Sequence, residues 1–385
     1  MMAETAASLF ASSAAGGETE APRTGVLPYQ AIRQAVREGI ICGAPDILPE
    51  QLQPASIDLR LGPVAYRVRA SFLPGGGRCV REKLDQFRMH EIDLTRGAVL
   101  ERGCVYIVQL TEWLRLPSRL SALANPKSST GRLDIFTRLI TDRATAFDRV
   151  EPGYNGPLYA EIAPRTFSIL VREGSRLNQL RLRRGSPSSS NTALRTLHES
   201  QRLVTTAEGT PATIFEDRIG VTLDLDCAET GLTGWRAKKH TDVIDIDVRG
   251  QYEVEDFWEP IKASPSYGLI LDPDDFYILS TREYVKVPRD WAAEMVAYDT
   301  MVGEFRVHYA GFFDPGFGEG EGNESKAVLE VRSHEVPFLL EHGQLVGWLR
   351  YERLAQSPDR AYGEGIGSNY QRQGLALAKQ FKQPR

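Results

Sequence analysis

The chain has 385 residues, a length that suits two domains of ordinary size. Its 46 lysines and arginines are outnumbered by 51 acidic residues, and the net charge of −5 excludes a protein that coats nucleic acid through bulk positive charge. No apolar run approaches the roughly 20 residues of a membrane span. The cysteines form no CxxC pair, which predicts free thiols in a reducing compartment: Cys42, Cys79, Cys104 and Cys227.

The first part of the chain combines one helical pattern with strand-like patterns. Residues 1–24 are rich in Ala, Ser and Gly, and this composition predicts a disordered tail. Residues 28–41 carry apolar side chains at helical spacing, so we expect a short helix there. Residues 56–61 alternate apolar with polar positions, which predicts a half-buried strand with Asp58 and Arg60 on the solvent side.

Short apolar runs between Pro, Gly and Asn turns follow, for example at 104–110 and 158–163. Many short strands with few helices predict an all-β barrel or sandwich rather than a doubly wound sheet. The polar segment 185–191 indicates a linker. After it, residues 192–204 return to helical spacing and residues 221–226 repeat the alternating strand pattern.

An internal repeat connects the two parts of the chain. Segment 105–117 aligns without a gap on segment 276–288, at a constant offset of 171 residues. Two further matches extend it: 151–156 with 314–319, and Glu161 with Glu330. Because the period is far too long for a solenoid, we predict a duplicated domain. The expected organisation is a disordered tail (1–24), a first, active copy (25–184), a linker (185–191), a degenerate second copy (192–361) and a C-terminal flap (362–385).

The two copies differ where hydroxyl and guanidinium groups gather. The first has NPKSSTGRL at 125–133, and at the same offset of 171 residues the second has VAYDTMVGE at 296–304. Ser128 is thereby replaced by Asp299 and Arg132 by Gly303. An anion site needs such hydroxyl and guanidinium donors. We therefore expect the chemistry in the first copy and mainly a scaffold in the second.

Several motifs occur together in the first copy, in the order GVLPYQAIRQAVREGII, QPASIDLRLG, KSSTGRL, RVEPGYNGPLYAEI and GSRLNQL. With this set the sequence resembles the dCTP deaminase branch of the dUTPase-like superfamily, most closely its long, two-repeat bacterial form. The resemblance implies a mainly β fold of duplicated, distorted β-barrel (β-clip) domains with a few short helices. It also implies active sites between subunits of a homo-oligomer, with a homotrimer favoured.

The resemblance further implies a cytoplasmic hydrolase that acts on a C–N bond. In that family water attacks C4 of the cytosine of dCTP, ammonia leaves and dUTP is formed, which supplies thymidylate synthesis. Mg²⁺ accompanies the nucleotide phosphates, no protein ligands hold it, and no zinc activates the water. The HxE…PCxxC signature of the zinc deaminases is indeed missing from this sequence.

Site residues follow from the same resemblance. The expected catalytic residues are Ser128 and Arg132, which would hold the attacking water and the phosphates, Arg149, which precedes the EPGYNG turn, and Glu161, the catalytic glutamate. Expected substrate and phosphate contacts are Lys127, Ser129, Tyr154 and Gln179 in the first copy, and Tyr370, Gln373 and Lys379 in the C-terminal flap. The chemistry agrees, since water needs a carboxylate to take its proton and to pass protons toward N3 and the leaving amine.

Alternative functions stay open at this point. A dUTPase would need an Asp in the hairpin turn, where this chain has Glu151. An enzyme that carries out both reactions also stays open, since some members of the family do so. A non-catalytic nucleotide-binding regulator is a rival from a different class. The expected partners are dCTP and dUTP, with dTTP as an inhibitor seen in some relatives, and neither nucleic acid nor a membrane. The sequence does not decide whether first and second copies form separate rings or alternate around one ring.

Overall fold

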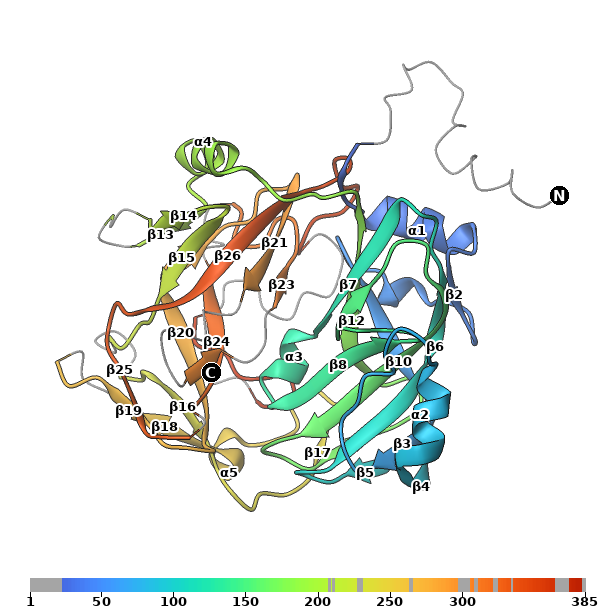
Figure 1. Ribbon diagram of the computed structural model, residues 1–385. Helices are drawn as coiled ribbons and strands as arrows, with labels where there is room; N and C mark the ends of the chain where they lie inside the picture. Colours follow the sequence, from blue (N-terminus) through green and yellow to red (C-terminus); the bar gives the residue numbers. More distant parts are fainter. Residues whose placement is uncertain are drawn as a thin grey trace.

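The computed structural model describes residues 23–206, 209, 212–226, 231–262, 266–296, 305–307, 311–320, 325–333, 335–363 and 374–382. The protein is mainly β with a few short helices, as predicted (Figure 1). Most of the expected disordered tail lies outside the described residues, as do Tyr370, Gln373 and Cys227. The other three cysteines are free thiols: Cys42, Cys79 and Cys104.

The first copy contains twelve strands and three α-helices. They are β1 (Gly25–Val26), α1 (Tyr29–Arg37), β2 (Ile41–Gly43), β3 (Ile57–Val68), α2 (Val80–Phe87), β4 (Arg88–Asp93), β5 (Ala98–Leu100), β6 (Val105–Arg115), β7 (Leu120–Pro126), α3 (Ser128–Gly131), β8 (Ile135–Thr141), β9 (Arg149–Val150), β10 (Asn155–Pro164), β11 (Ile169–Val171) and β12 (Arg176–Arg184), with a 3₁₀ turn at Pro49–Gln51. Ten of the strands form one sheet whose main order is β8-β10-β6-β3-β12-β7-β9.

Strand β3 lies at the middle of this sheet and differs from its prediction. Asp58 and Arg60 are 2% and 3% exposed, so both faces of the strand are buried. The two charges are tolerated because each has a partner: Asp58 pairs with Lys127, and the Arg60 Nε lies 2.8 Å from a Glu112 carboxylate oxygen. Period-two alternation therefore found the strand correctly, but the polar face is covered rather than solvated.

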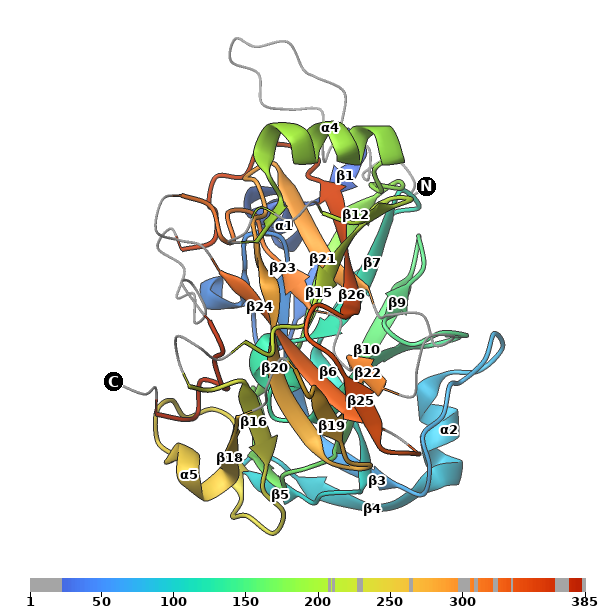
Figure 2. The ribbon, with the colours of Figure 1, turned by 90° about the vertical axis from the view of Figure 1, so that its left-hand side faces the viewer.

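The second copy follows the same plan with shorter strands. Its elements are α4 (Asn191–Gln201), β13 (Val204–Thr205), β14 (Ile214–Phe215), β15 (Arg218–Thr222), β16 (Gly234–Ala237), β17 (Ile244–Asp245), α5 (Val254–Phe257), β18 (Trp258–Ile261), β19 (Leu269–Leu271), β20 (Phe276–Val285), β21 (Trp291–Val296), β22 (Phe305–Val307), β23 (Phe312–Phe313), β24 (Lys326–Ser333), β25 (Phe338–Leu340) and β26 (Leu345–Arg353). Figure 2 shows this copy in front, with α4 across its top.

The duplication is confirmed element by element. Strands β6 and β20 occupy the segments that align at an offset of 171 residues, and β10 with β24 and β12 with β26 are equivalent pairs in the same order. In the second copy the sheet is divided, with β18-β16-β20-β24-β22 in one part and β14-β15-β26-β21-β23 in another. The repeat alignment therefore predicted the equivalent strands but not this division.

The two copies are joined through shared structure as well as by the linker. Strand β17 of the second copy pairs in parallel with β11 of the first. The hydrophobic core of the first copy also includes second-copy side chains, such as Trp258 and Phe276, and Phe381 of the C-terminal segment. In Figure 1 the short helix α3 lies where the two halves meet. No helix among the described residues is long and apolar enough to cross a membrane.

Candidate active site

The Ser-Ser-Arg element forms helix α3 and the residues on either side of it, at the end of β7. The backbone N–H of Lys127 and the hydroxyl of Thr130 both donate to the carbonyl of Leu177, at 2.8 and 2.9 Å. These bonds tie the element to β12, where Gln179 lies across from both Asp58 and Asn125. Ser128 is partly exposed, whereas Ser129 and Gln179 are buried. The structure therefore groups Lys127, Ser128, Ser129 and Gln179, as expected.

Arg132 points from this element into the second copy. Its Nη1 donates to the carbonyl of Ala376 at 3.0 Å, and its Nε lies 3.9 Å from a carboxylate oxygen of Glu330 on β24. Both side chains are buried. Burial raises the pKa of Glu330 to about 7, although the nearby Arg132 charge acts in the opposite direction. A carboxylate with a pKa near neutrality is suited to accept a proton.

A second carboxylate from the same copy lies beside this group. Asp314, which opens the turn equivalent to EPG of the first copy, has its Oδ1 3.6 Å from Nη2 of the fully buried Arg181. Burial raises the pKa of Asp314 to about 6, and among the charges that act on it are those of Asp58 and Lys127. The second copy therefore contributes two acidic side chains to the neighbourhood of α3.

The C-terminal segment brings a further cation to the same place. Lys379 is half-buried, and its pKa is lowered first by burial and then by the charges of Lys127 and Arg249. Together with the contact from Arg132 to Ala376, this places residues 374–382 over the α3 site. Lys379 therefore lies where the flap was expected, while Tyr370 and Gln373 are outside the described residues.

Glu161 pairs with an arginine of the neighbouring strand β8. It is 1% exposed on β10, and one carboxylate oxygen accepts from Nε and Nη2 of Arg138 on β8, at 3.0 and 2.5 Å. The Arg138 guanidinium also packs over the rings of Phe136 and Phe147. Because Arg138 is three residues along β8, roughly 10 Å of strand separate this ion pair from Ile135 at the end of the α3 element. Within one chain, Glu161 does not join Ser128 and Arg132.

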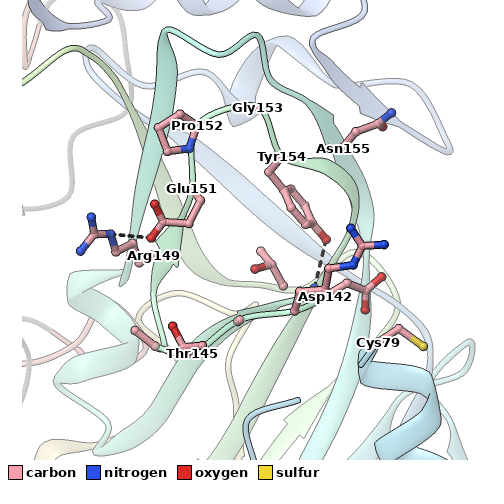
Figure 3. A pocket seen from close by; sticks show the side chains of 13 residues that line it. Cys79, Asp142, Thr145, Arg149, Glu151, Pro152, Gly153, Tyr154 and Asn155 are labelled. Carbon is pink, nitrogen blue, oxygen red and sulfur yellow. Dashed lines mark hydrogen bonds and ion pairs between the residues drawn. The ribbon is translucent and has the colours of Figure 1, made fainter. Parts of the chain in front are cut away.

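Arg149 and Tyr154 line a separate cavity on the first copy, of about 440 Å³ (Figure 3). Arg149 is largely exposed and forms a 2.9 Å ion pair with Glu151, which lies in the same turn. The Tyr154 hydroxyl donates to the carbonyl of Pro157 at 2.6 Å and accepts from the backbone of Asp142 at 3.2 Å. Tyr154 thus closes the turn and stabilises it.

Sequence reasoning missed Glu330 and Asp314 as site residues. The signal was present, because the repeat alignment pairs Glu330 with Glu161 and DPG with EPG. The second copy lost its Ser-Ser-Arg element but retained these carboxylates. The second copy, expected to be mainly a scaffold, thus also brings acidic groups to the α3 site of the first.

The cations of this junction suit an anion with several charges. Lys127, Arg132 and Lys379 present ammonium and guanidinium groups, the donors that bind phosphate oxygens. No group of three or more His, Cys, Asp or Glu side chains with metal-binding geometry occurs among the described residues. The fold is that of a duplicated, mainly β protein, and the junction of its two copies brings cationic side chains beside the buried carboxylate of Glu330.

Comparisons with known proteins agree with this class. The N-terminal domain of 2′-deoxycytidine 5′-triphosphate deaminase (DCD) matches residues 23–186, and the C-terminal domain of the same enzyme matches residues 190–381. A crystal structure of 2′-deoxycytidine 5′-triphosphate deaminase from Agrobacterium tumefaciens is 55% identical, with a TM-score of 0.83 over 87% of this chain and 99% of that chain. The chain belongs to the 2′-deoxycytidine 5′-triphosphate deaminase family.

Shorter relatives match only part of the chain. "dCTP deaminase, dUMP-forming" of Beutenbergia cavernae is 32% identical over 29% of this chain and 58% of its own length. The protein of the same name from Halobacterium salinarum is 31% identical over 34% of this chain and 65% of its own. The chain thus spans about three fifths of the length of these curated relatives.

Proposed function

We propose that the protein is a hydrolase that deaminates dCTP to dUTP and ammonia at the junction of α3 and β24, and so supplies dUTP for thymidylate synthesis. The observation that carries the proposal is the buried Glu330, whose carboxylate lies 3.9 Å from Arg132 and has a pKa of about 7. Family membership supplies the substrate class. The geometry supports a complete set of roles within one chain.

The reaction needs a base and a shuttle for protons. In the proposed mechanism Ser128 and Arg132 orient a water molecule toward C4 of cytosine, and Glu330 takes one of its protons as the oxygen attacks C4. Glu330 then passes protons toward N3 and the departing amino group. The C4–N bond breaks, ammonia leaves and a C4 carbonyl remains, which gives dUTP. Lys127, Gln179 and Lys379 bind the triphosphate.

Mg²⁺ accompanies the triphosphate in this proposal. The cations around α3 suit phosphate oxygens, so the ion belongs with the nucleotide and neutralises part of its charge. Zinc has no role in the proposed chemistry. We also propose a cytoplasmic homotrimer, in which the part of the first copy that holds the buried Glu161 and the exposed Arg149 lies toward neighbouring chains, and inhibition by dTTP at the same junction.

The decisive experiment compares Glu330→Gln with Glu161→Gln in assays of dCTP with Mg²⁺. We expect Glu330→Gln to lower kcat about 10²- to 10⁴-fold while dCTP still binds, because Gln occupies the same space but cannot accept the proton. Exposed Glu91 offers the matched control, Glu91→Gln. Chelation of Mg²⁺ should slow the wild-type reaction, and added Mg²⁺ should restore it.

Other outcomes would contradict this assignment. Full activity of Glu330→Gln with loss of activity in Glu161→Gln would make Glu161 the base and place the site between chains. If the wild-type protein produces neither ammonia nor dUTP from dCTP, the deaminase proposal is wrong, and a nucleotide-binding regulator is favoured.

A dUMP-forming activity is the second candidate, and Asp314 favours it. This buried carboxylate is acted on by the charges of Asp58 and Lys127, and with a pKa of about 6 it is ionised at neutral pH. It could take a proton from water that attacks the α-phosphorus and releases pyrophosphate. In the same assay, dUMP and pyrophosphate would appear with the wild-type protein, and Asp314→Asn would stop their release while ammonia is still formed.

A further inference from the structure

The loop between β17 and α5, residues 246–253 of the second copy, is fastened to the first copy near the candidate site. Arg172 makes a bidentate pair with Asp245 at 2.9 and 2.8 Å, and its Nη1 also donates to Asp247 at 2.8 Å. The Ser175 hydroxyl donates to Asp247 at 2.6 Å. Bidentate pairs fix geometry as well as proximity, so the loop has a defined position against the first copy.

The same loop holds the C-terminal segment. The N–H of Gly250 donates to the carbonyl of Lys379 at 3.0 Å, and the Gln380 amide donates to the carbonyl of Ile246 at 2.6 Å. Phe381 packs with its ring centroid 5.5–6.3 Å from those of three aromatic residues: Tyr252, Phe257 and Trp258. The backbone that carries Lys379 is therefore held at both sides by the loop.

This arrangement brings three cations from three parts of the chain together. Lys127 precedes α3, Lys379 belongs to the C-terminal segment, and Arg249 belongs to the 246–253 loop; the charges of Lys127 and Arg249 both act on Lys379. Asp247 and Asp58 are also close, but Asp247 is bound by Arg172 and Asp58 by Lys127. The exposed Arg249 makes no ion pair with any described residue. Like charges gathered in this way repel one another until an anion lies between them.

We propose that Arg249 is a phosphate-binding residue for the outer phosphates of the nucleotide, and that it acts with Lys127 and Lys379. The inference rests on the proposed function of the α3 site. Glu330, the proposed base, is buried, whereas Arg249 is exposed and Lys127 and Lys379 are half-buried, so we assign these three cations to the phosphate end of the substrate. A guanidinium can donate two parallel hydrogen bonds to one phosphate group, which suits the terminal position of a triphosphate.

The experiment measures equilibrium binding of dUTP, dUMP and inorganic tripolyphosphate to the full chain. We expect Arg249→Ala to raise the Kd for dUTP and tripolyphosphate about tenfold and the Kd for dUMP less than twofold, because only the longer ligands reach it. Arg249→Lys keeps the charge but loses the paired donors. Its Kd for dUTP and for tripolyphosphate should therefore lie between that of the wild type and that of Arg249→Ala. Arg353→Ala, which removes an exposed arginine at the end of β26, is the control and should bind as the wild type does.

Two results would overturn the proposal. Unchanged Kd values for dUTP and tripolyphosphate in Arg249→Ala would exclude the contact, and an equal loss for dUMP would indicate a general disturbance of the loop. The tripolyphosphate measurement does not depend on deamination. A wild-type protein that releases no ammonia from dCTP would therefore contradict the proposed function alone, while the phosphate role of Arg249 is still decided.

Discussion

Burial determines the protonation of the carboxylate that faces the Ser128–Arg132 element. Glu330 is equivalent to Glu161 in the repeat, but Glu161 is bound by Arg138 at 2.5 Å, whereas Glu330 lies 3.9 Å from the Nε of Arg132. Removal from water disfavours the charged form, and the nearby Arg132 charge compensates only in part, so the pKa of Glu330 is about 7. The same residue type thus has different chemistry in the two copies.

A pH profile follows from this value. A general base acts in its ionised form, so kcat/KM for dCTP should fall as the pH drops through about 7 and should level off above it. The acidic limb should disappear in Glu330→Gln together with most of the activity. A limb near 4.5, the ordinary value for a glutamate, would show that the base is a solvated carboxylate. Measurement at constant ionic strength keeps screening of the phosphate contacts from changing along the profile.

Strand β24 is fixed against the α3 element by a buried ion pair. Arg332, two residues after Glu330, pairs with Asp134, and its Nη2 donates to the Thr166 hydroxyl at 2.9 Å. Its Nη1 donates to the carbonyl of Asp274 at 2.6 Å. Since residues two apart on a strand point to the same side, this pair also positions Glu330 beside Arg132.

Removal of one member of this pair should be costly. Asp134→Asn leaves a buried guanidinium without its countercharge, and we expect the free energy of unfolding to fall by about 3–5 kcal/mol in urea titrations. The double variant Asp134→Asn with Arg332→Met should recover part of that loss. Arg218→Ala breaks a more exposed pair with Glu216 and should cost no more than about 1 kcal/mol. A loss of no more than about 1 kcal/mol in Asp134→Asn would show that the Asp134–Arg332 pair is dispensable.

The sequence predicted well which segments form helices and which form strands. It predicted poorly which distant residues these elements contact. Apolar periodicity found α1, α4, β3, β6 and β10, because each period reflects one local geometry. The repeat alignment predicted that β24 is equivalent to β10. It could not predict that Glu330 lies against Arg132, since that contact depends on how two complete sheets pack. Asp58 and Arg60 show the same limit, because their partners come from distant strands.

The hydrophobic core of the first copy is shared between the two copies, while the second copy also has a core of its own. Second-copy side chains from β16, β17, α5, β18, β20 and β24, together with the C-terminal segment, complete the first cluster, which consists mostly of first-copy residues. Arg183 on β12 adds an ion pair to each of two second-copy carboxylates, Glu294 and Glu352, at 2.9 and 2.8 Å. Neither copy is therefore an independent folding unit in the way that domains on a flexible linker are.

We expect a single cooperative unfolding transition. Trp113 lies in the first copy and the other four tryptophans in the second: Trp235, Trp258, Trp291 and Trp348. Of these, Trp258 belongs to the first copy's core and Trp235 packs against it, so Trp291 and Trp348 report on the second copy. Thermal curves from far-ultraviolet circular dichroism, from the fluorescence of wild type and from that of Trp113→Phe should coincide, with calorimetric and van't Hoff enthalpies in agreement. Two separate transitions would show that the copies unfold independently despite their common core.

Glu330 of the second copy lies beside Arg132 of the first, and this arrangement affects how the site can evolve. When identical short subunits meet, one codon determines both sides of every shared site, so each subunit must keep both halves. Duplication within a single gene removes that obligation, because positions 128–132 and 299–303 now mutate separately. The second copy has discarded its serines and arginine while it retains Glu330, and the first copy retains both sets. One gene thus encodes two copies of the same barrel, and each copy can change independently on its own side of the junction.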